Sequence, residues 1–465
     1  MKYLILIIVF FTTTSIYSQN LGIKAKVDER TELLSIVFRL AGAEEYSWGT
    51  LPKYNDDIDN CFGKFRDCDV IKYAKKLRNS KGIMYDKVMS LAIHIEINDL
   101  TISLKNNVAP NSLNKRWSEK DTKKFIDYLS VFYNKSDFKT FFNDHKNLYS
   151  IAESRFDKNL ENINFKWFDE FYGQEPQDNY KVIISMTNGG ANYGPKVIDS
   201  KGKETKFAIL GTVETDSLEN PIYPTTIIPT IIHEFNHSYC NHLILDNINE
   251  FSSSGKKIYS KVKKQMKSQA YGSYQTMLYE SLVRASVIKY LESNDTTENR
   301  IEKAIVDEER NSFIWTDMLV DKLSVYENNR DKYKTLESYM PKLVLFFDSI
   351  AENFDAYYDE FSLNCPKIIS SSIENKSKIN PTLTEIIFKF NKPMQNQGYG
   401  FSYGKGGKDS FPKIASVVWI DKQTIKLNVT LTNKKEYSMT FYTRAYVSED
   451  GCPMLKGFEL EFITQ

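Results

Sequence analysis

Apolar residues recur at helical spacing over two long parts of the chain. From Asp28 to about Lys166 they return every three or four positions, and residues 256 to 360 repeat this pattern. Such spacing places apolar side chains on one face of a helix, so both parts are predicted to be mainly helical. The first part is marked by Leu33, Leu34, Val37, Phe38, Leu40, Val88, Leu91, Ala92 and Ile95, and the second by Met277, Leu278, Leu282, Val283 and Val287.

Between these two parts the pattern changes to that of β-strands. Residues 181–186 and 206–212 are short apolar runs, and the Gly- and Asn-rich segment 187–195 separates them. Short apolar runs bounded by turn residues are typical of strands. They predict a small sheet at about residues 180–215.

Beyond Pro366 the chain has only short apolar runs at close spacing. They lie at residues 384–390, 415–420, 424–431 and 437–442, separated by turns rich in Gly, Asn and Lys. This pattern is typical of a small antiparallel sandwich. We therefore predict an α+β protein, with a mainly helical domain at residues 20–362 and an all-β, immunoglobulin-like sandwich at residues 363–465.

Composition narrows the classes of partner. With 465 residues the chain is long enough for two or three domains. Its 61 Lys and Arg residues nearly balance 60 Asp and Glu residues, giving a formal net charge of +1. Nucleic acid is therefore not expected as a partner.

The first 19 residues have the pattern of a secretory signal peptide. Lys2 precedes the apolar run Leu4–Phe11, and the following segment with the small residues Ser15 and Ser18 predicts cleavage before Gln19 or Asn20. The run is too short to cross a bilayer, and no later stretch is long enough, so no stable membrane span is expected. These features predict a secreted or periplasmic protein; an uncleaved membrane anchor is the alternative.

Five cysteines in an exported chain leave at least one unpaired. Cys61 and Cys68 are close enough in sequence to close a small loop, and Cys365 and Cys452 bracket the sandwich. Cys240 would then be a buried free thiol. Four cysteines allow three connectivities, so this pairing is one hypothesis among them.

The strongest chemical signal is His233-Glu234-Phe235-Asn236-His237. Residues four apart share one face of a helix, so His233 and His237 are predicted to be ligands of one Zn²⁺ ion. Glu234 beside them is the candidate general base. The helix is expected at about residues 229–243. The alternative is an ordinary amphipathic helix whose two histidines line the core.

A catalytic zinc usually has three protein ligands. A metzincin needs Gly and His at positions 240 and 243, where this chain has Cys and Leu. His242 would point about 140° away from His237 on a continuous helix. Glu280 is the best candidate because it stands among apolar residues, with Arg284 one turn on to orient it. A plain Glu–Arg pair is the alternative, and Asp246 and Glu250 are weaker candidate ligands.

Other residues are candidates for substrate contacts. Tyr193, Tyr271 and Tyr274 are candidates to stabilise an oxyanion, although each can equally be a core or surface residue. The segment from Asn188 to Gly194 is a candidate edge for β-augmentation, in which its glycines admit a peptide backbone. A glycine-rich hairpin turn is an equal alternative.

Together, these features resemble a known family. Residues 28–41, 188–194, 233–238 and 280–285 are similar to secreted bacterial proteins classified as a domain of unknown function and suspected to be zinc peptidases. The similarity spans about residues 25–360. The tail, with Phe390-Asn391-Lys392-Pro393-Met394, resembles a bacterial immunoglobulin-like module of exported enzymes. In gluzincin peptidases, the matching roles are His233 and His237 as ligands, Glu234 as base and a downstream Glu as third ligand.

Two functional hypotheses follow. The first is an exported zinc metallopeptidase that hydrolyses a peptide or protein with a zinc-activated water and Glu234 as base. The second is a non-catalytic envelope or extracellular binding protein, with the sandwich contacting a cell-envelope partner. The presence of Glu234 favours the enzyme, because a structural zinc has no need of a base and prefers four ligands, usually rich in Cys.

Overall fold

The computed structural model describes residues 22–109, 111–173, 179–294 and 298–465. The expected signal peptide, residues 1–19, lies outside these ranges. The described chain is α+β, as predicted, and forms two compact units. The first comprises the chain up to Asp246 together with Tyr326–Met340. The second comprises Asn247–Val325 and Pro341–Gln465.

The first unit is built around a four-stranded sheet in the order β1-β4-β6-β5. Its strands are β1 (Ala25–Val27), β4 (Tyr180–Ser185), β5 (Lys196–Ile198) and β6 (Glu204–Gly211). β1, β4 and β6 are parallel, whereas β5 is an antiparallel edge strand. β4 and β6 have buried residues on both faces, as expected of a parallel sheet covered on both sides. This confirms the sheet predicted at about residues 180–215.

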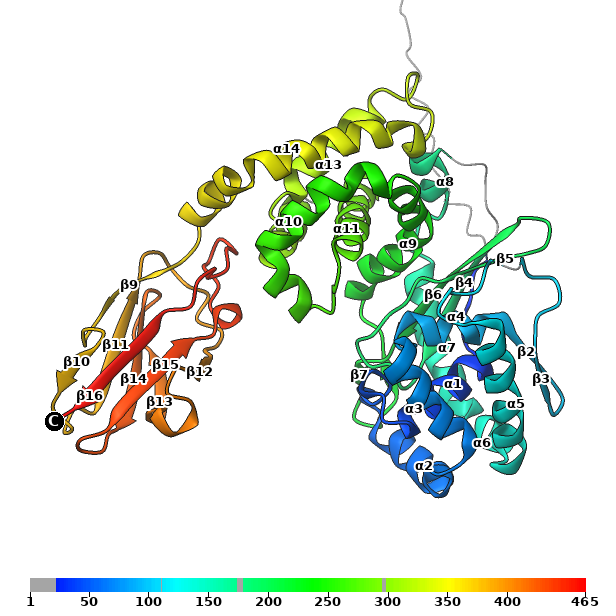
Figure 1. Cartoon of the computed structure of the whole chain (residues 1–465), viewed down its shortest axis with the longest axis horizontal. Coiled ribbons are helices and arrows are strands. Elements are labelled where there is room, and N and C mark those ends of the chain that lie inside the picture. The colour runs from blue at the N-terminus through cyan, green and yellow to red at the C-terminus, as the bar shows by residue number, and fades with distance from the viewer. Residues whose placement is uncertain (1–21, 110, 174–178, 295–297) are drawn as a thin grey trace, which may run out of the picture. The chain divides into compact units, whose positions relative to one another are not determined.

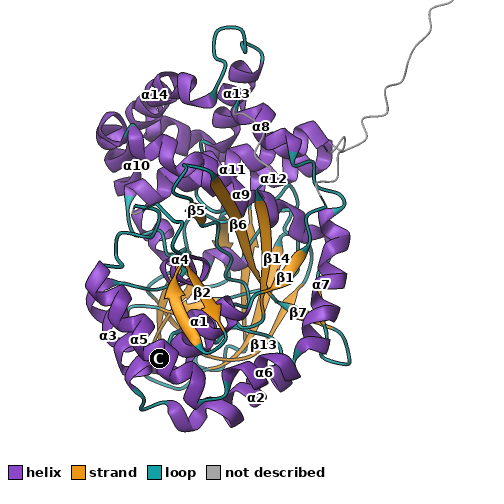
Figure 2. Ribbon diagram, turned by 90° about the vertical axis from the view of Figure 1, so that its right-hand side faces the viewer, coloured by secondary structure: helices purple, strands orange, loops and turns teal. Residues whose placement is uncertain are grey.

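Helices of the first unit surround this sheet (Figures 1 and 2). In chain order they are α1 (Glu29–Leu40), α2 (Pro52–Phe62), α3 (Asp69–Lys81), α4 (Asp86–His94), α5 (Glu119–Lys135), α6 (Phe138–Asp144), α7 (Lys146–Leu160) and α8 (Lys166–Tyr172), followed after the sheet by α9 (Ile228–Asp246). The helical prediction for residues 28–166 is interrupted by a hairpin of β2 (Ile95–Asn98) and β3 (Thr101–Leu104). Ile95 therefore begins a strand rather than continuing the helix.

A buried carboxylate links α1 to the end of β4. Glu32 is fully buried and accepts hydrogen bonds from the Met186 N–H at 2.9 Å and the Tyr54 hydroxyl at 2.8 Å. Tyr54 in turn shares a hydrogen bond with Tyr149 on α7. Burial raises the pKa of Glu32 to about 7, although the bonds from Met186 and Tyr54 act in the opposite direction.

In the second unit, helices precede a β-sandwich (Figure 1). The helices are α10 (Ile248–Ser268), α11 (Tyr274–Asn294), α12 (Glu298–Arg310), α13 (Thr316–Glu327), whose last two residues belong to the first unit, and α14 (Leu336–Leu363) from Pro341 onward. α11 packs against α10 and α12. Gly255 allows the close approach of α10 and α11, because a Cβ there would lie 2.9 Å from the Tyr274 ring.

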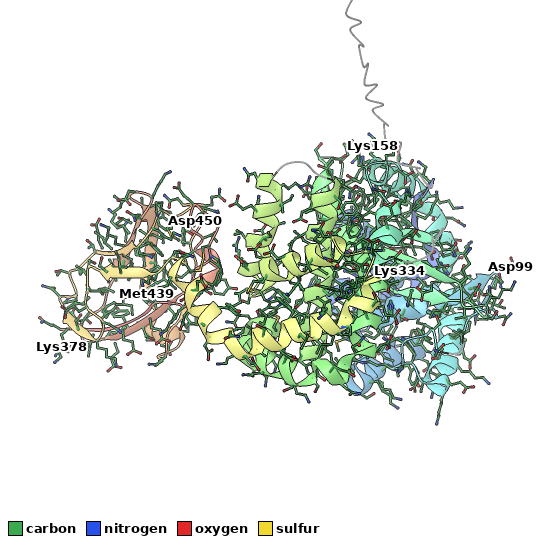
Figure 3. The ribbon with its side chains drawn as sticks, turned by 90° about the horizontal axis from the view of Figure 1, so that it is seen from above. Asp99, Lys158, Lys334, Lys378, Met439 and Asp450 are labelled. Atoms are coloured by element: carbon green, nitrogen blue, oxygen red, sulfur yellow. A yellow bond between two sulfur atoms is a disulfide. The ribbon has the colours of Figure 1, made fainter. Side chains whose placement is uncertain are left out.

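The sandwich consists of two four-stranded sheets, in the orders β10-β16-β15-β12 and β13-β14-β11-β9. Its strands are β9 (Ile368–Ser371), β10 (Ser377–Ile379), β11 (Glu385–Phe390), β12 (Phe401–Tyr403), β13 (Lys413–Trp419), β14 (Thr424–Thr430), β15 (Glu436–Phe441) and β16 (Glu459–Thr464). Alternate residues such as Ile386, Phe388 and Leu427 are fully buried, as is Met439 (Figure 3). The predicted sandwich is confirmed, except that β10 pairs with β16 in parallel.

The cysteine hypothesis is correct in part. Cys365 and Cys452 form a disulfide, and Cys240 is a buried free thiol. The pairing of Cys61 with Cys68 is wrong, since both are free. Cys61 is an exposed residue on α2, whereas Cys68 precedes α3 as its N-cap residue, and a 3₁₀ turn at Gly63–Phe65 separates them.

In the described part of the chain, no helix combines the length and apolar character that crossing a bilayer requires. This agrees with the expectation of no membrane-spanning helix.

Glu32 generates a prediction about pH. Because the pKa of Glu32 is about 7 in the folded protein and about 4.5 in the unfolded chain, folding favours its protonated form. The stability that protonated Glu32 contributes is fully present below pH 4.5 and is lost as the pH rises through 7. The free energy of unfolding falls by about 3 kcal/mol over this range. We expect Glu32→Gln to remove this loss, as measured by urea unfolding at several pH values. Equal pH slopes for the two proteins would contradict the prediction.

Candidate metal centre

The predicted zinc helix is α9, which spans Ile228–Asp246 without a break. One side of it packs against β6 and is fully buried, with Ile231, Ile232, Phe235 and Tyr239. The Phe235 ring lies among the rings of Phe165, Phe168 and Tyr180. This apolar packing fixes the rotation of α9.

The two motif histidines lie on a side of α9 that is only partly buried. The His233 and His237 rings have centroids 4.8 Å apart and are nearly perpendicular, at 86°. His237 Nδ1 lies 3.2 Å from Asn241 Oδ1, where it donates a hydrogen bond. This bond selects the tautomer whose Nε2 carries the lone pair, as is usual for histidine ligands of metals. Sequence reasoning missed Asn241, although its position one turn after His237 was a usable signal.

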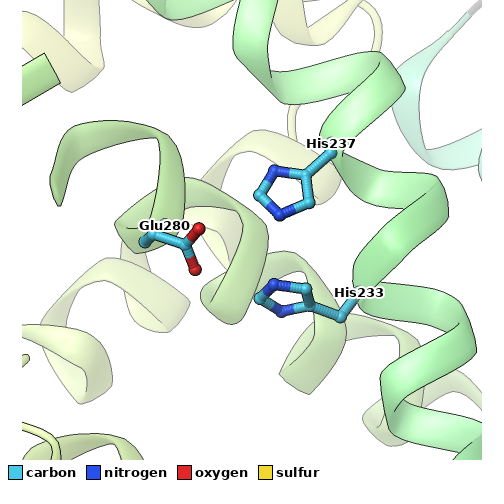
Figure 4. A group of neighbouring side chains, drawn as sticks. All are labelled: His233, His237 and Glu280. Atoms are coloured by element: carbon cyan, nitrogen blue, oxygen red, sulfur yellow. The ribbon is translucent and has the colours of Figure 1, made fainter. Parts of the chain in front are cut away.

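Glu280, the predicted third ligand, completes the group. It lies on α11, and its side chain faces the two histidines in Figure 4. One ligand atom from each of His233, His237 and Glu280 lies within 4.8 Å of the others. Among the residues that the structure describes, this is the one such group of three or more His, Cys, Asp or Glu side chains. Two imidazole nitrogens and one carboxylate oxygen are a donor set that fits zinc.

Glu280 is 6% exposed and has polar neighbours within its own unit. The Tyr271 hydroxyl donates to Glu280 Oε2 at 3.1 Å, and Arg284 Nε lies 3.4 Å from the same oxygen. Arg284 also forms an ion pair with Glu308 on α12. Burial lowers the pKa of Arg284, but Glu308, Tyr271 and Glu280 together raise it above its ordinary value. Arg284 thus contacts Glu280 as expected. The contact of Tyr271 with Glu280 and that of Glu308 with Arg284 were not predicted.

The loop before β5 lies directly on the motif helix. A Cβ on Gly194 would collide with the backbone carbonyl oxygen of Glu234, and the Ser238 hydroxyl reaches the Gly194 carbonyl at 3.5 Å. Gly189 has a positive φ of 55° and is packed against the Trp48 backbone. These two glycines therefore accommodate the chain's own backbone.

The remaining candidate residues lie in different surroundings. Asn188 is fully buried, and its Oδ1 accepts a hydrogen bond from Ser185. The Tyr193 side chain is buried beside Tyr46, and this burial raises its pKa, while its backbone pairs with Ile209. The Tyr274 ring packs against Gly255, with Lys256 Nζ 5.5 Å from its centroid.

The weaker candidate ligands are outside the group. His242 is half-buried on α9, and burial followed by the charge of Lys196 lowers its pKa. Asp246 is the last residue of α9, and Glu250 lies in the first turn of α10; both are exposed.

A separate cavity of about 650 Å³ lies in the first unit, between α2, α6, α7 and the loop after β7 (Glu214–Thr215) that leads to β8 (Pro221–Ile222). Tyr54, Asp57 and His145 line it, and none of the predicted site residues does. Pocket size alone would therefore not have located the motif.

The contact of Gly194 with α9 can be tested with an internal control. Gly194→Ala is expected to force the edge strand away from Glu234 and to destabilise the protein by about 1–3 kcal/mol or more. Gly190→Ala is the matched control, because a Cβ there meets only Val213, at 3.8 Å. Equal unfolding free energies for both variants in urea would contradict the packing described here.

Comparison with known proteins assigns a family to residues 23–346 of the chain. A search of curated proteins finds no match. Among solved structures, CopC from Methylosinus trichosporium OB3b is 14% identical, with a TM-score of 0.18, over 22% of this chain and 93% of that one. Domains 1–6 of the surface layer protein SbsC are 17% identical, with a TM-score of 0.17, over 50% of this chain and 33% of that one. Scores this low carry no argument. The model of a family described as "Domain of unknown function (DUF4932)" matches residues 23–346, so the chain belongs to that family.

Proposed function

We propose that this protein is an exported zinc-dependent metallopeptidase. The observation that carries the proposal is the grouping of His233, His237 and Glu280 within 4.8 Å, with Glu234 next to the first histidine on α9. Three ligands of this type are typical of catalytic zinc sites, which keep a fourth position for water.

The surroundings support a catalytic rather than a structural ion. A structural zinc usually has four ligands and favours Cys. The nearest cysteine in sequence, Cys240, is fully buried, and its sulfur shares a hydrogen bond with the Tyr172 hydroxyl at 3.2 Å. It is not part of the metal-binding group.

Glu234 supplies the acid–base chemistry in this proposal. A zinc ion held by the three ligands would lower the pKa of a bound water and polarise the scissile carbonyl. A carboxylate oxygen of Glu234 would accept a proton from the attacking water and would later donate it to the leaving amine. Glu234 is 5% exposed, so its carboxylate works in a largely water-excluded setting, where electrostatic effects are strong.

The proposed substrate is an extended peptide, bound as an added strand beside β5. β5 is the edge strand of its sheet, and the loop leading into it contacts the Glu234 backbone. Edge strands offer backbone groups for β-augmentation. In β5 those of Ile198 are already used, because its N–H donates to Ser112 Oγ and its C=O accepts from the Ala109 N–H, so the added strand is proposed to lie beside Lys196. The proposal also includes export of the protein and a cell-envelope partner that contacts the sandwich.

The competing hypothesis is a non-catalytic binding protein. It predicts that partner binding survives the loss of Glu234, whereas the enzyme hypothesis predicts that hydrolysis does not. A Glu234→Gln variant therefore separates the two hypotheses.

Metal analysis tests the ligand set. Purified residues 20–465 are expected to contain one zinc ion per chain, and Glu280→Ala is expected to lose it because a buried ligand is removed. His242→Ala is the control and should keep the ion, since His242 is outside the group. Absence of zinc from the unmutated protein would overturn the proposed function.

Glu234→Gln tests catalysis. It is expected to reduce hydrolysis of a quenched fluorescent peptide library at least about 10²–10⁴-fold, while the zinc content stays at one per chain. The glutamine has nearly the same shape but cannot accept the proton. Unchanged turnover in this variant would remove Glu234 from the mechanism.

A further inference from the structure

Glu280 is an acid in an apolar part of α11. Met277, Leu278, Leu282 and Val283 around it in sequence are all fully buried, and Glu280 itself is only 6% exposed. An ionised carboxylate in such a place is costly unless donors compensate for the lost water. The way in which Glu280 is compensated therefore bears on how it can bind a metal.

Two groups from the same unit lie at the same carboxylate oxygen. The Tyr271 hydroxyl donates a hydrogen bond to Glu280 Oε2 at 3.1 Å, whereas Arg284 Nε lies 3.4 Å from that oxygen and forms an ion pair without a hydrogen bond. Tyr271 accepts a hydrogen bond from Arg284 Nη2 at 2.8 Å, so its own proton is directed to Glu280. This use of the Tyr271 proton differs from the role of oxyanion donor considered from the sequence.

Arg284 is itself held from several sides. Its Nη1 pairs with Glu308 on α12, and its guanidinium lies over the Phe313 ring, 4.8 Å from the centroid. Its side chain is 13% exposed. A planar guanidinium fixed by an ion pair, a hydrogen bond and a ring has little freedom to turn away.

Tyr271 is also fixed through its backbone. Its N–H donates to the Met266 carbonyl at 2.9 Å, and its carbonyl accepts a hydrogen bond from the Tyr259 hydroxyl at 3.0 Å. Both partners lie on α10, so the turn between α10 and α11 holds Tyr271 beside Glu280.

We propose that Tyr271, Arg284 and Glu308 are positioning residues that hold Glu280 Oε2, so that Glu280 offers the metal its other oxygen, Oε1. The proposal rests on the proposed zinc site and adds to it the groups that set how its third ligand binds. Such supporting contacts typically change metal affinity 10–100-fold.

Zinc affinity in the full chain is the first test, measured by competition with a chromogenic chelator. Tyr271→Phe and Glu308→Gln are expected to weaken zinc binding by about tenfold or more, because Oε2 loses a donor or Arg284 loses its anchor. Glu309→Gln is the matched control: Glu309 is the next carboxylate on α12 and lines a separate cavity with Phe354 and Tyr358. Its variant should bind zinc as the unmutated protein does.

The visible spectrum of the Co²⁺-substituted protein is the second test, since it reports ligand geometry directly. Release of Oε2 should let both oxygens of Glu280 approach the metal and weaken the absorption as coordination number rises. Arg284→Lys keeps the charge but loses the planar fork. The Arg284→Lys variant should show the same weaker absorption. Its melting temperature should stay close to that of Glu309→Gln.

The outcomes separate the two proposals. If the unmutated protein binds one zinc ion and Tyr271→Phe and Glu308→Gln match it in affinity and spectrum, the positioning role is overturned and the metal site stands. If the unmutated protein binds no zinc, the proposed function fails and the positioning role fails with it. Glu308 is 21% exposed, so its variant remains informative even if Tyr271→Phe does not fold.

Discussion

Backbone contact between Gly194 and Glu234 is the constraint on which the motif side of the site depends. It brings the segment before the edge strand to within van der Waals contact of α9, which only a residue without a Cβ permits. The Phe235 ring packs on the other side of the helix against Tyr180 of β4. With both sides fixed, the direction in which His233 and His237 point is determined by packing, and Asn241 sets the tautomer of the second.

Electrostatics govern the other side of the site. Glu280 is buried, and Tyr271 and Arg284 both lie at the same oxygen of its carboxylate, where they offset the loss of water. Glu308 offsets the charge of Arg284, so the group contains two carboxylates and one guanidinium in a setting with little water. Addition of a divalent cation beside Glu280 would relieve the remaining negative charge. This remaining charge supports the proposed metal site.

Local sequence patterns predicted the features of the site that depend on residues close together in the chain. The four-residue spacing of His233 and His237 defined α9, and an acid among apolar residues identified Glu280. Glu308 and the role of Tyr271 were missed, because their contacts with Arg284 and Glu280 depend on how α12 and the α10–α11 turn pack. Strand β1 was also missed, since three residues are too few for a period to be visible, and it pairs with a strand over 150 residues away.

The sandwich is joined to the helices of its unit by more than a linker. The disulfide between Cys365 and Cys452 closes a loop with a sequence separation of 87, which stabilises the fold by restricting the unfolded chain. Gly451, next to that disulfide, has a positive φ and lies against Val306 on α12. Because α12 also carries Glu308, the loop anchored by the disulfide packs on the helix that holds Arg284. The C-terminal module therefore contributes to the scaffold behind Glu280, in addition to any surface that it offers to a partner.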